Sequence, residues 1–283
     1  MPPLQNLANT FACGSGRFAT EIDVMHKNMM KDISIIDTTI ENIAQLGVCG
    51  YKNIKKPGLP EKMNWLRGRF SEGLKIKSLY SEKDGTQGMI EYIPGKYCWR
   101  PVKAQDFMFI HCIFVGFKNV YKNNGFASQL IAECEKDAKK QKLKGVAVVT
   151  RKGSFMAGKE IVVKNNYTVA DSATPDFELL VKKFTKNAPD PKFNIKPIDR
   201  SSGLTIIRAD QCPYTIKNVK EICETAENDY GIKINVINLK NYKEAQDTPN
   251  PFGTFCMVYN GAIIADSPIS NGRFKNIMKK LKA

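Results

Sequence analysis

The hydrophobic pattern of residues 30–185 predicts strands and helices arranged around one central strand. Residues 107–115 are apolar nearly throughout, which is typical of a strand covered on both faces of a sheet. Before the central strand, the pattern predicts strand Ile33–Ile36, a helix opened by the capping box Thr38-x-x-Glu41, a helix after Pro57–Pro60, and strands Leu74–Tyr80 and Gly88–Pro94, with Tyr97–Val102 continuing their meander. The central strand itself is predicted at Phe107–Val115. After it, the pattern predicts a long helix carrying Leu130, Ile131 and Ala138, strand Gly145–Thr150, a helix through Phe155–Val163, and strands Tyr167–Ala170 and Phe177–Val181. The expected order is β-α-α-β-β-β-α-β-α-β-β.

A second unit is predicted after a Pro-rich break at residues 187–192. Its pattern predicts strand Leu204–Ile207, helix Ile216–Asp229, strands Ile232–Leu239, Phe255–Tyr259 and Ala262–Ala265, and helix Phe274–Leu281. This β-α-β-β-β-α order is that of a thioredoxin-like unit. We therefore expect a first domain at 30–186, a linker at 187–202 and a small C-terminal domain at 203–283.

Residues 1–29 show no sustained periodicity, and their apolar core is too broken for a secretory leader. Regular patterning begins at Met30, so we expect 1–29 to be an extension outside the fold, either a translation artefact or an added leader. An organellar targeting peptide stays open, although Glu21 and Asp23 count against it. No apolar stretch is long enough to predict a membrane span.

Composition narrows the classes of partner and compartment. The 283 residues contain 43 Lys plus Arg and 28 Asp plus Glu, a formal charge of +15. The basic residues are dispersed and accompany no nucleic-acid-binding motif, so a solvated basic surface is favoured over a nucleic-acid partner. Eight Cys occur without a C-x-x-C pair, which argues against a structural metal site and favours a reducing, cytoplasmic location.

The segment Lys122-Asn123-Asn124-Gly125-Phe126-Ala127 is a candidate anion-binding loop. A Gly-containing loop that enters a helix exposes unpaired backbone N–H groups at the positive end of the helix dipole. A plain turn is the commoner use of such a segment. Its position, after the most apolar strand and before the longest predicted helix, favours the binding role.

The loop and the element order together resemble the GNAT superfamily of acyl-CoA-dependent N-acyltransferases. Residues 122–127 are similar to the family's [Q/R]-x-x-G-x-[G/A] pyrophosphate loop, with Lys in the first position. The resemblance implies an α/β (α+β) fold with a mixed central sheet flanked by helices, and acetyl-CoA as co-substrate. It also implies that the pantetheine arm of the co-substrate runs along Ile113, Phe114 and Val115. The usual Tyr general acid is missing, because Val162 occupies its position.

Acetyl transfer to an ammonium group requires a base, and the candidates are Glu91 and His111. Each has an equally plausible alternative: Glu91 as a solvated strand residue, and His111 as a core histidine. Cys112 is a conceivable nucleophile, but a lone buried Cys usually serves packing. Direct attack on the thioester needs no nucleophilic side chain, and we expect that route.

Cys212-Pro213-Tyr214-Thr215 resembles the glutaredoxin motif C-P-Y-C with Thr in place of the second Cys. A Cys at a helix N-cap followed by Pro is a candidate low-pKa thiol, although the missing Cys excludes a dithiol cycle within the motif. A degenerate domain kept for contacts is equally plausible. With residues 251–255 (PFGTF) and 259–261 (YNG), the tail resembles that of the YoaP-type acetyltransferases, which are bacterial GNAT proteins.

The predicted function is therefore acetyl-CoA-dependent acetylation of an amine on a small molecule or peptide. A thiol, redox or thiol-ligand protein acting through Cys212 is the alternative, and a nucleic-acid binder rests on charge alone. The acceptor and the oligomeric state are left open.

Overall fold

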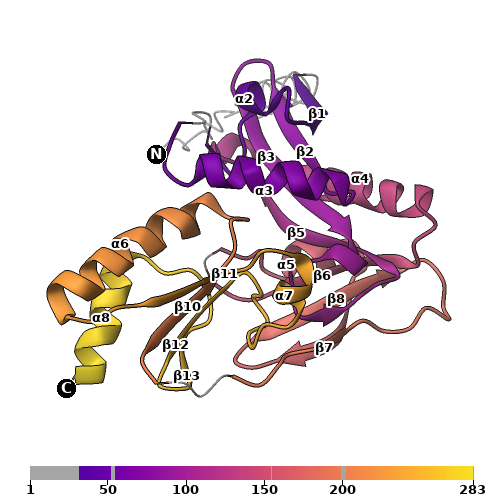
Figure 1. Cartoon of the computed structure of the whole chain (residues 1–283). Coiled ribbons are helices and arrows are strands. Elements are labelled where there is room, and N and C mark those ends of the chain that lie inside the picture. Colours follow the sequence, from indigo (N-terminus) through magenta and orange to yellow (C-terminus); the bar gives the residue numbers. More distant parts are fainter. Residues whose placement is uncertain (1–31, 52–54, 154, 199–201, 283) are drawn as a thin grey trace, which may run out of the picture.

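The computed structural model describes residues 32–51, 55–153, 155–198 and 202–282 (Figure 1). The extension predicted at residues 1–29 lies outside the described residues. The first half contains β1 (Ile33–Thr38), α2 (Ile43–Leu46), α3 (Leu59–Ser71), β2 (Lys75–Ser81), β3 (Gly85–Pro94), β4 (Val102–Lys103), β5 (Phe107–Val115), α4 (Phe126–Lys140), β6 (Gly145–Thr150), α5 (Glu160–Val163), β7 (Thr168–Ala173) and β8 (Phe177–Lys183). Apart from the two-residue β4, this is the predicted order.

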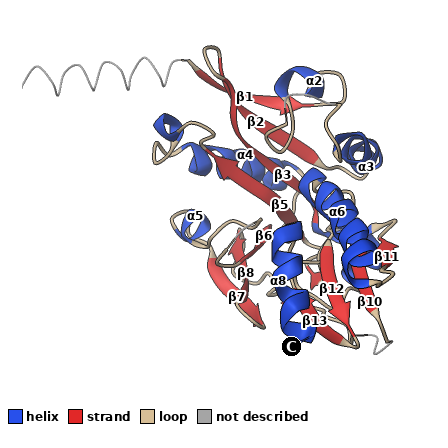
Figure 2. Ribbon diagram, turned by 90° about the vertical axis from the view of Figure 1, so that its left-hand side faces the viewer, coloured by secondary structure: helices blue, strands red, loops and turns tan. Residues whose placement is uncertain are grey.

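Seven strands form one mixed sheet in the order β1-β2-β3-β5-β6-β8-β7. Every neighbouring pair is antiparallel except β5 and β6, which are parallel. Helix α4 covers one face, where Leu130 and Ile131 join a core with Ile90 and Ile110. Helix α3 and the C-terminal half cover the other face (Figures 1 and 2). The sheet is therefore buried on both faces, as the apolar run of β5 requires.

Three local predictions are wrong for backbone reasons. Thr38 does not cap a helix, because it is still paired with Ile76 of β2. The helix predicted through Phe155–Val163 shortens to α5, since Phe155 has a φ of 66°, which no helical residue adopts. Residues 97–102 do not continue the meander: a 3₁₀ turn and the short β4 follow β3 instead.

The C-terminal half forms a second sheet of four strands. It contains β10 (Leu204–Arg208), α6 (Pro213–Tyr230), β11 (Asn235–Asn238), α7 (Tyr242–Gln246), β12 (Phe255–Tyr259), β13 (Ala262–Ala265) and α8 (Asn271–Lys282). The strand order is β11-β10-β12-β13, with β10 and β11 parallel and the remaining pairs antiparallel. Helices α6 and α8 pack together through Tyr230 and Phe274, whose rings are 6.0 Å apart. The short helix α7 is an addition to the predicted elements.

The two halves share one continuous apolar core. Trp65 and Trp99 of the first half belong to the same buried cluster as Val219 and Phe255 of the second. The predicted linker also contains a short strand, β9 (Lys192–Phe193), which pairs with β4. At the start of α3, Gly58 has a φ of +86°, and a Cβ on it would stand 2.3 Å from the carbonyl oxygen of Pro213. The helices α3 and α6 thus meet at close backbone contact.

This contact predicts opposite effects of alanine at two glycines of the same helix region. Gly58→Ala should lower the free energy of unfolding by at least about 1 kcal/mol, because the left-handed backbone is strained and the methyl group collides with Pro213. Gly68→Ala, inside α3 with open space around it, should raise that free energy by roughly 0.5–1 kcal/mol. Urea unfolding of both variants measures the difference. Equal effects would contradict the proposed contact.

Candidate active site

A β-bulge in β5 shapes the centre of the site. Glu91 of β3 pairs with Cys112, but the next residue, Tyr92, pairs with Ile110, so His111 is an extra residue in β5. The bulge shifts the alternation of side chains. Phe109 and Phe114 consequently face the α3 side of the sheet although five positions separate them.

Beyond the bulge, β5 separates from its parallel neighbour. The pairing of β5 with β6 ends at Ile110 and Val148, whereas β5 continues to Val115. On the other side it remains paired with β3 as far as Gly88. Residues 111–115 therefore have one backbone edge without a partner strand among the described residues. The predicted pantetheine-contact positions Ile113, Phe114 and Val115 lie on this segment.

The predicted anion-binding loop leads from β5 to α4. Lys122, Asn123 and Gly125 are exposed, Asn124 and Ala127 are half-buried, and Phe126 is buried as the first residue of α4. The Asn124 side chain donates to the carbonyl oxygens of Val120 (2.8 Å) and Lys122 (3.1 Å) and closes the loop on itself. Phe126 can therefore contribute only its backbone to a ligand.

The N-terminus of α4 is open to an approaching group. Gly125 caps the helix with a φ of 77°, and no atom lies within 4 Å of where its Cβ would stand. In the described part of the chain, the N–H groups of residues 125–128 have no acceptor. The first turn of α4 carries no acidic side chain, so nothing in it offsets the positive end of the dipole.

The candidate base Glu91 is the centre of a buried network on the α3 face. Its Oε2 accepts a 2.6 Å bond from Lys62 Nζ, and both side chains are fully buried. Its Oε1 accepts a 2.9 Å bond from Gln211 Nε2 of the C-terminal half. Burial alone would raise the pKa of Glu91, but the charge of Lys62 and the contact with His111 outweigh it and lower the pKa to about 2. Glu91 is thus ionised throughout the physiological range.

The second candidate base, His111, is held in its neutral form. Its Nε2 accepts a 3.0 Å bond from the backbone N–H of Trp99, which places the ring proton on Nδ1. Nδ1 lies 3.4 Å from Glu91 Oε1, a long and weak contact, and has no other partner among the described residues. Burial is the largest cause that lowers the pKa of His111 to about 4. The structure therefore brings Glu91 and His111 together. The atoms through which either could accept a proton from a substrate already accept hydrogen bonds from other groups.

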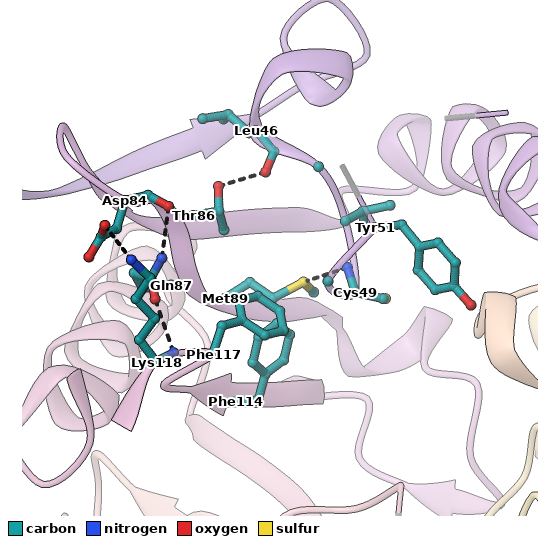
Figure 3. A pocket seen from close by; sticks show the side chains of 13 residues that line it. Leu46, Cys49, Tyr51, Asp84, Thr86, Gln87, Met89, Phe114, Phe117 and Lys118 are labelled. Atoms are coloured by element: carbon teal, nitrogen blue, oxygen red, sulfur yellow. Dashed lines mark hydrogen bonds and ion pairs between the residues drawn. The ribbon is translucent and has the colours of Figure 1, made fainter. Parts of the chain in front are cut away.

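A small pocket of about 170 Å³ lies beside Phe114, between β3, the end of β5 and the segment after α2 (Figure 3). Its lining side chains bond mainly to one another. Thr86 Oγ1 donates to the Leu46 carbonyl oxygen (2.6 Å), and the Cys49 N–H donates to Met89 Sδ (3.4 Å). The pocket residues are Leu46, Gly47, Val48, Cys49, Gly50, Tyr51, Asp84, Thr86, Gln87, Met89, Phe114, Phe117 and Lys118.

The Cys-Pro-Tyr segment is docked against the same side of the first half. Cys212 is the N-cap of α6 and Pro213 follows in its first turn, as predicted. The ring of Tyr214 packs on Tyr51 of the pocket, with ring centroids 4.8 Å apart.

Among the described residues, no group of three or more His, Cys, Asp or Glu side chains has the arrangement of a metal site. Within the same residues, every helix is too short or too polar to traverse a bilayer.

Sequence reasoning missed Lys62, Arg100 and Gln211, the residues that surround the two candidates. The burial of Lys62 could have been predicted from the sequence, because it lies three residues after Leu59 and four before Leu66 on the apolar face of α3. The burial of Arg100 and Gln211 could not have been predicted in this way, since both lie in irregular segments without a periodic pattern. Only the three-dimensional contact between the halves brings them to the site.

The neutral state of His111 predicts a specific loss of stability in acid. Because its pKa falls from 6.5 unfolded to about 4 folded, the unfolded chain takes up a proton that the folded one excludes. Lowering the pH from above 6.5 to 4 should therefore cost about 3 kcal/mol of unfolding free energy. His111→Gln should remove most of this slope, as measured by urea unfolding across pH 4.5–7. An unchanged slope in the variant would show that His111 is not held neutral.

Comparison with known proteins finds similarity in both halves of the chain. A family model described as YoaP-like matches residues 233–276. The chain is 28% identical over 253 residues to the uncharacterized N-acetyltransferase YoaP of Bacillus subtilis (strain 168), a match that covers 87% of this chain and 98% of that protein.

Two solved structures are similar to part of the chain. One is the PaiA N-acetyltransferase of Thermoplasma acidophilum in complex with coenzyme A (17% identity, TM-score 0.39, 54% of this chain and 99% of that one). The other is an N-acetyltransferase of Staphylococcus aureus Mu50 (15% identity, TM-score 0.40, 54% and 99%). The thioredoxin-like class of the C-terminal half stays a prediction. The chain is thus similar along nearly its whole length to an N-acetyltransferase named YoaP, and its C-terminal half contains a YoaP-like segment.

Proposed function

We propose that the chain transfers an acetyl group from acetyl-CoA to an amine of a small molecule or peptide by direct attack on the thioester. The observation that carries this proposal is the open N-terminus of α4 next to the unpaired edge of β5. The N–H groups of residues 125–128 would bind the pyrophosphate, and the exposed Lys122 would add a positive charge. Gly125 leaves room for the anion to approach the backbone.

The unpaired edge of β5 would bind the pantetheine arm. Within the described ranges, the backbone groups of Ile113, Phe114 and Val115 lack a partner strand on that side, and an extended amide-containing arm can take the place of one. The anion loop at residues 122–127 and this edge belong to consecutive segments of the chain. A ligand with a diphosphate at one end and a pantetheine arm at the other fits both.

The pocket beside Phe114 would admit the acceptor amine. It lies on the α3 face of β5, and the rings of Phe114 and Phe117 are 4.8 Å apart at its wall. Asp84, at the polar end, forms a 2.6 Å ion pair with Lys118 and accepts a bond from Tyr121. Since that carboxylate is already engaged, the pocket favours the acceptor amine in its neutral form over an ammonium ion.

Acetyl-CoA supplies an acyl group activated as a thioester. In the proposed reaction the acceptor nitrogen forms a bond to the carbonyl carbon while the carbon–sulfur bond breaks, and the proton released by the nitrogen passes through water to the sulfur. No covalent acyl-enzyme is needed. Burial raises the pKa of the Cys112 thiol to about 12, which makes it a poor nucleophile near neutral pH.

A general base among the side chains stays a prediction. Glu91, with a pKa near 2, is a weak proton acceptor at neutral pH, and His111 Nε2 is engaged by the Trp99 amide. Their contacts favour another contribution, which is to fix the shape of β5 where the thioester would lie.

The proposal predicts that two glycine substitutions of equal backbone strain differ in ligand binding. Gly125 and Gly231 both cap helices with left-handed backbone (φ 77° and 64°), and a Cβ on either would meet open space. Alanine at either position should cost roughly 1–2 kcal/mol of unfolding free energy. Gly125→Ala alone should weaken acetyl-CoA binding, by about tenfold or more, because its methyl group occupies the surface that the pyrophosphate would cover.

Isothermal titration with acetyl-CoA measures both variants against the wild type. Gly231→Ala should retain wild-type affinity, since it lies at the far end of α6. Wild-type protein that fails to bind acetyl-CoA at millimolar concentration, or equal affinity losses in the two variants, would contradict the proposed role of the loop.

A further inference from the structure

We propose that Gln211, a residue of the C-terminal half, is a positioning residue of the transferase site. It contacts no predicted ligand-binding group itself. Its side chain instead bridges Glu91 and Arg100 at the boundary between the halves, and through Glu91 it supports the bulge at His111. The inference rests on the proposed function for its catalytic meaning, whereas its structural part can be tested without any substrate.

The orientation of the Gln211 amide is dictated by its neighbours. Its Nε2 donates to Glu91 Oε1 (2.9 Å), and its Oε1 accepts from Arg100 Nη1 (3.2 Å). A flipped amide would place NH₂ against a guanidinium and oxygen against a carboxylate. Both ends of the side chain are therefore committed, and only 6% of the residue is exposed.

Arg100 makes the bridge hard to replace. Its charge is buried without an ion-pair partner among the described residues, and burial lowers its pKa to about 10. Nη1 is satisfied by three neutral acceptors: the Trp99 carbonyl oxygen (2.9 Å), Thr254 Oγ1 (3.1 Å) and Gln211 Oε1. Two of these acceptors come from the C-terminal half. Removing Gln211 would thus leave the buried Glu91 carboxylate one hydrogen bond short and take one nearby acceptor from the buried Arg100 cation.

The network continues from Glu91 to the strand that would bind the co-substrate. Glu91 Oε1 lies 3.4 Å from His111 Nδ1, and the opposite nitrogen of the same ring accepts from the Trp99 N–H. His111 is the extra residue of the bulge, and pairing of β5 with β6 ends at the residue before it. The side chain at 211 consequently supports the point at which β5 leaves β6.

Gln246 offers a matched control at the same boundary. Its Nε2 also joins the two halves, donating to the carbonyl oxygens of Cys98 (3.1 Å) and Lys96 (3.2 Å). Among the residues that the structure describes, its side chain forms no hydrogen bond to Glu91 or His111. Substituting either glutamine by methionine keeps the side-chain size and removes the hydrogen bonds, so the two variants separate a general loss of contact from a loss at the site.

Amide hydrogen exchange, followed by mass spectrometry on peptides that cover residues 107–115, tests the structural part. We expect Gln211→Met to accelerate exchange in these peptides by roughly tenfold and Gln246→Met to leave them unchanged. Equal exchange in Gln211→Met and Gln246→Met would overturn the inference.

Titration with acetyl-CoA and with CoA tests the functional part. A disturbed bulge should weaken the binding of the thioester end of acetyl-CoA more than the binding of its diphosphate end. Gln211→Met should therefore lose about fivefold in acetyl-CoA affinity while its CoA affinity stays near that of the wild type. Gln246→Met should preserve both. Parallel losses for the two ligands would contradict a positioning role, whereas a wild type that binds neither ligand would refute the proposed function instead.

Discussion

The ion pair between Lys62 and Glu91 is the interaction on which the site depends. It joins α3 to the central sheet at 2.6 Å with both charges removed from solvent. Such a pair gains little over an apolar contact, but losing one partner costs about 3–5 kcal/mol, because the remaining charge stays buried. Its net contribution to stability is therefore small, whereas the cost of separating the two charges opposes any packing of α3 that leaves Lys62 away from Glu91.

The bulge in β5 and the separation from β6 are parts of one arrangement. The extra residue turns the strand, and the turned strand can no longer follow its parallel neighbour. Helix α3 and irregular segments of both halves contribute side chains that hold this region. The loop at Gly125 differs from this region, because the backbone N–H groups of residues 125–128 have no hydrogen-bond acceptor among the described residues. A centre held by many side-chain contacts thus lies beside an accessible backbone edge.

The sequence predicted the element order well because apolar periodicity and turn residues are local signals. The loop at 122–127 could be located for the same reason: the glycine, the preceding apolar strand and the following helix are contiguous. The network around Glu91 could not be located, because its members lie far apart in the sequence: Gln211 follows Glu91 by 120 residues. The capping box at Thr38 was wrong because pairing with β2 outweighed a local preference, an effect that no local window contains.

The partnership of Gln211 with Glu91 and Arg100 has an evolutionary consequence. Because the buried charges of Glu91 and Arg100 in the first half bond to the Gln211 amide of the second, a substitution in either half limits which residues the other half can carry at these positions. Recombination that exchanged either half for a distant homologue would then yield chimaeras that are defective unless positions 91, 100 and 211 were inherited as a set.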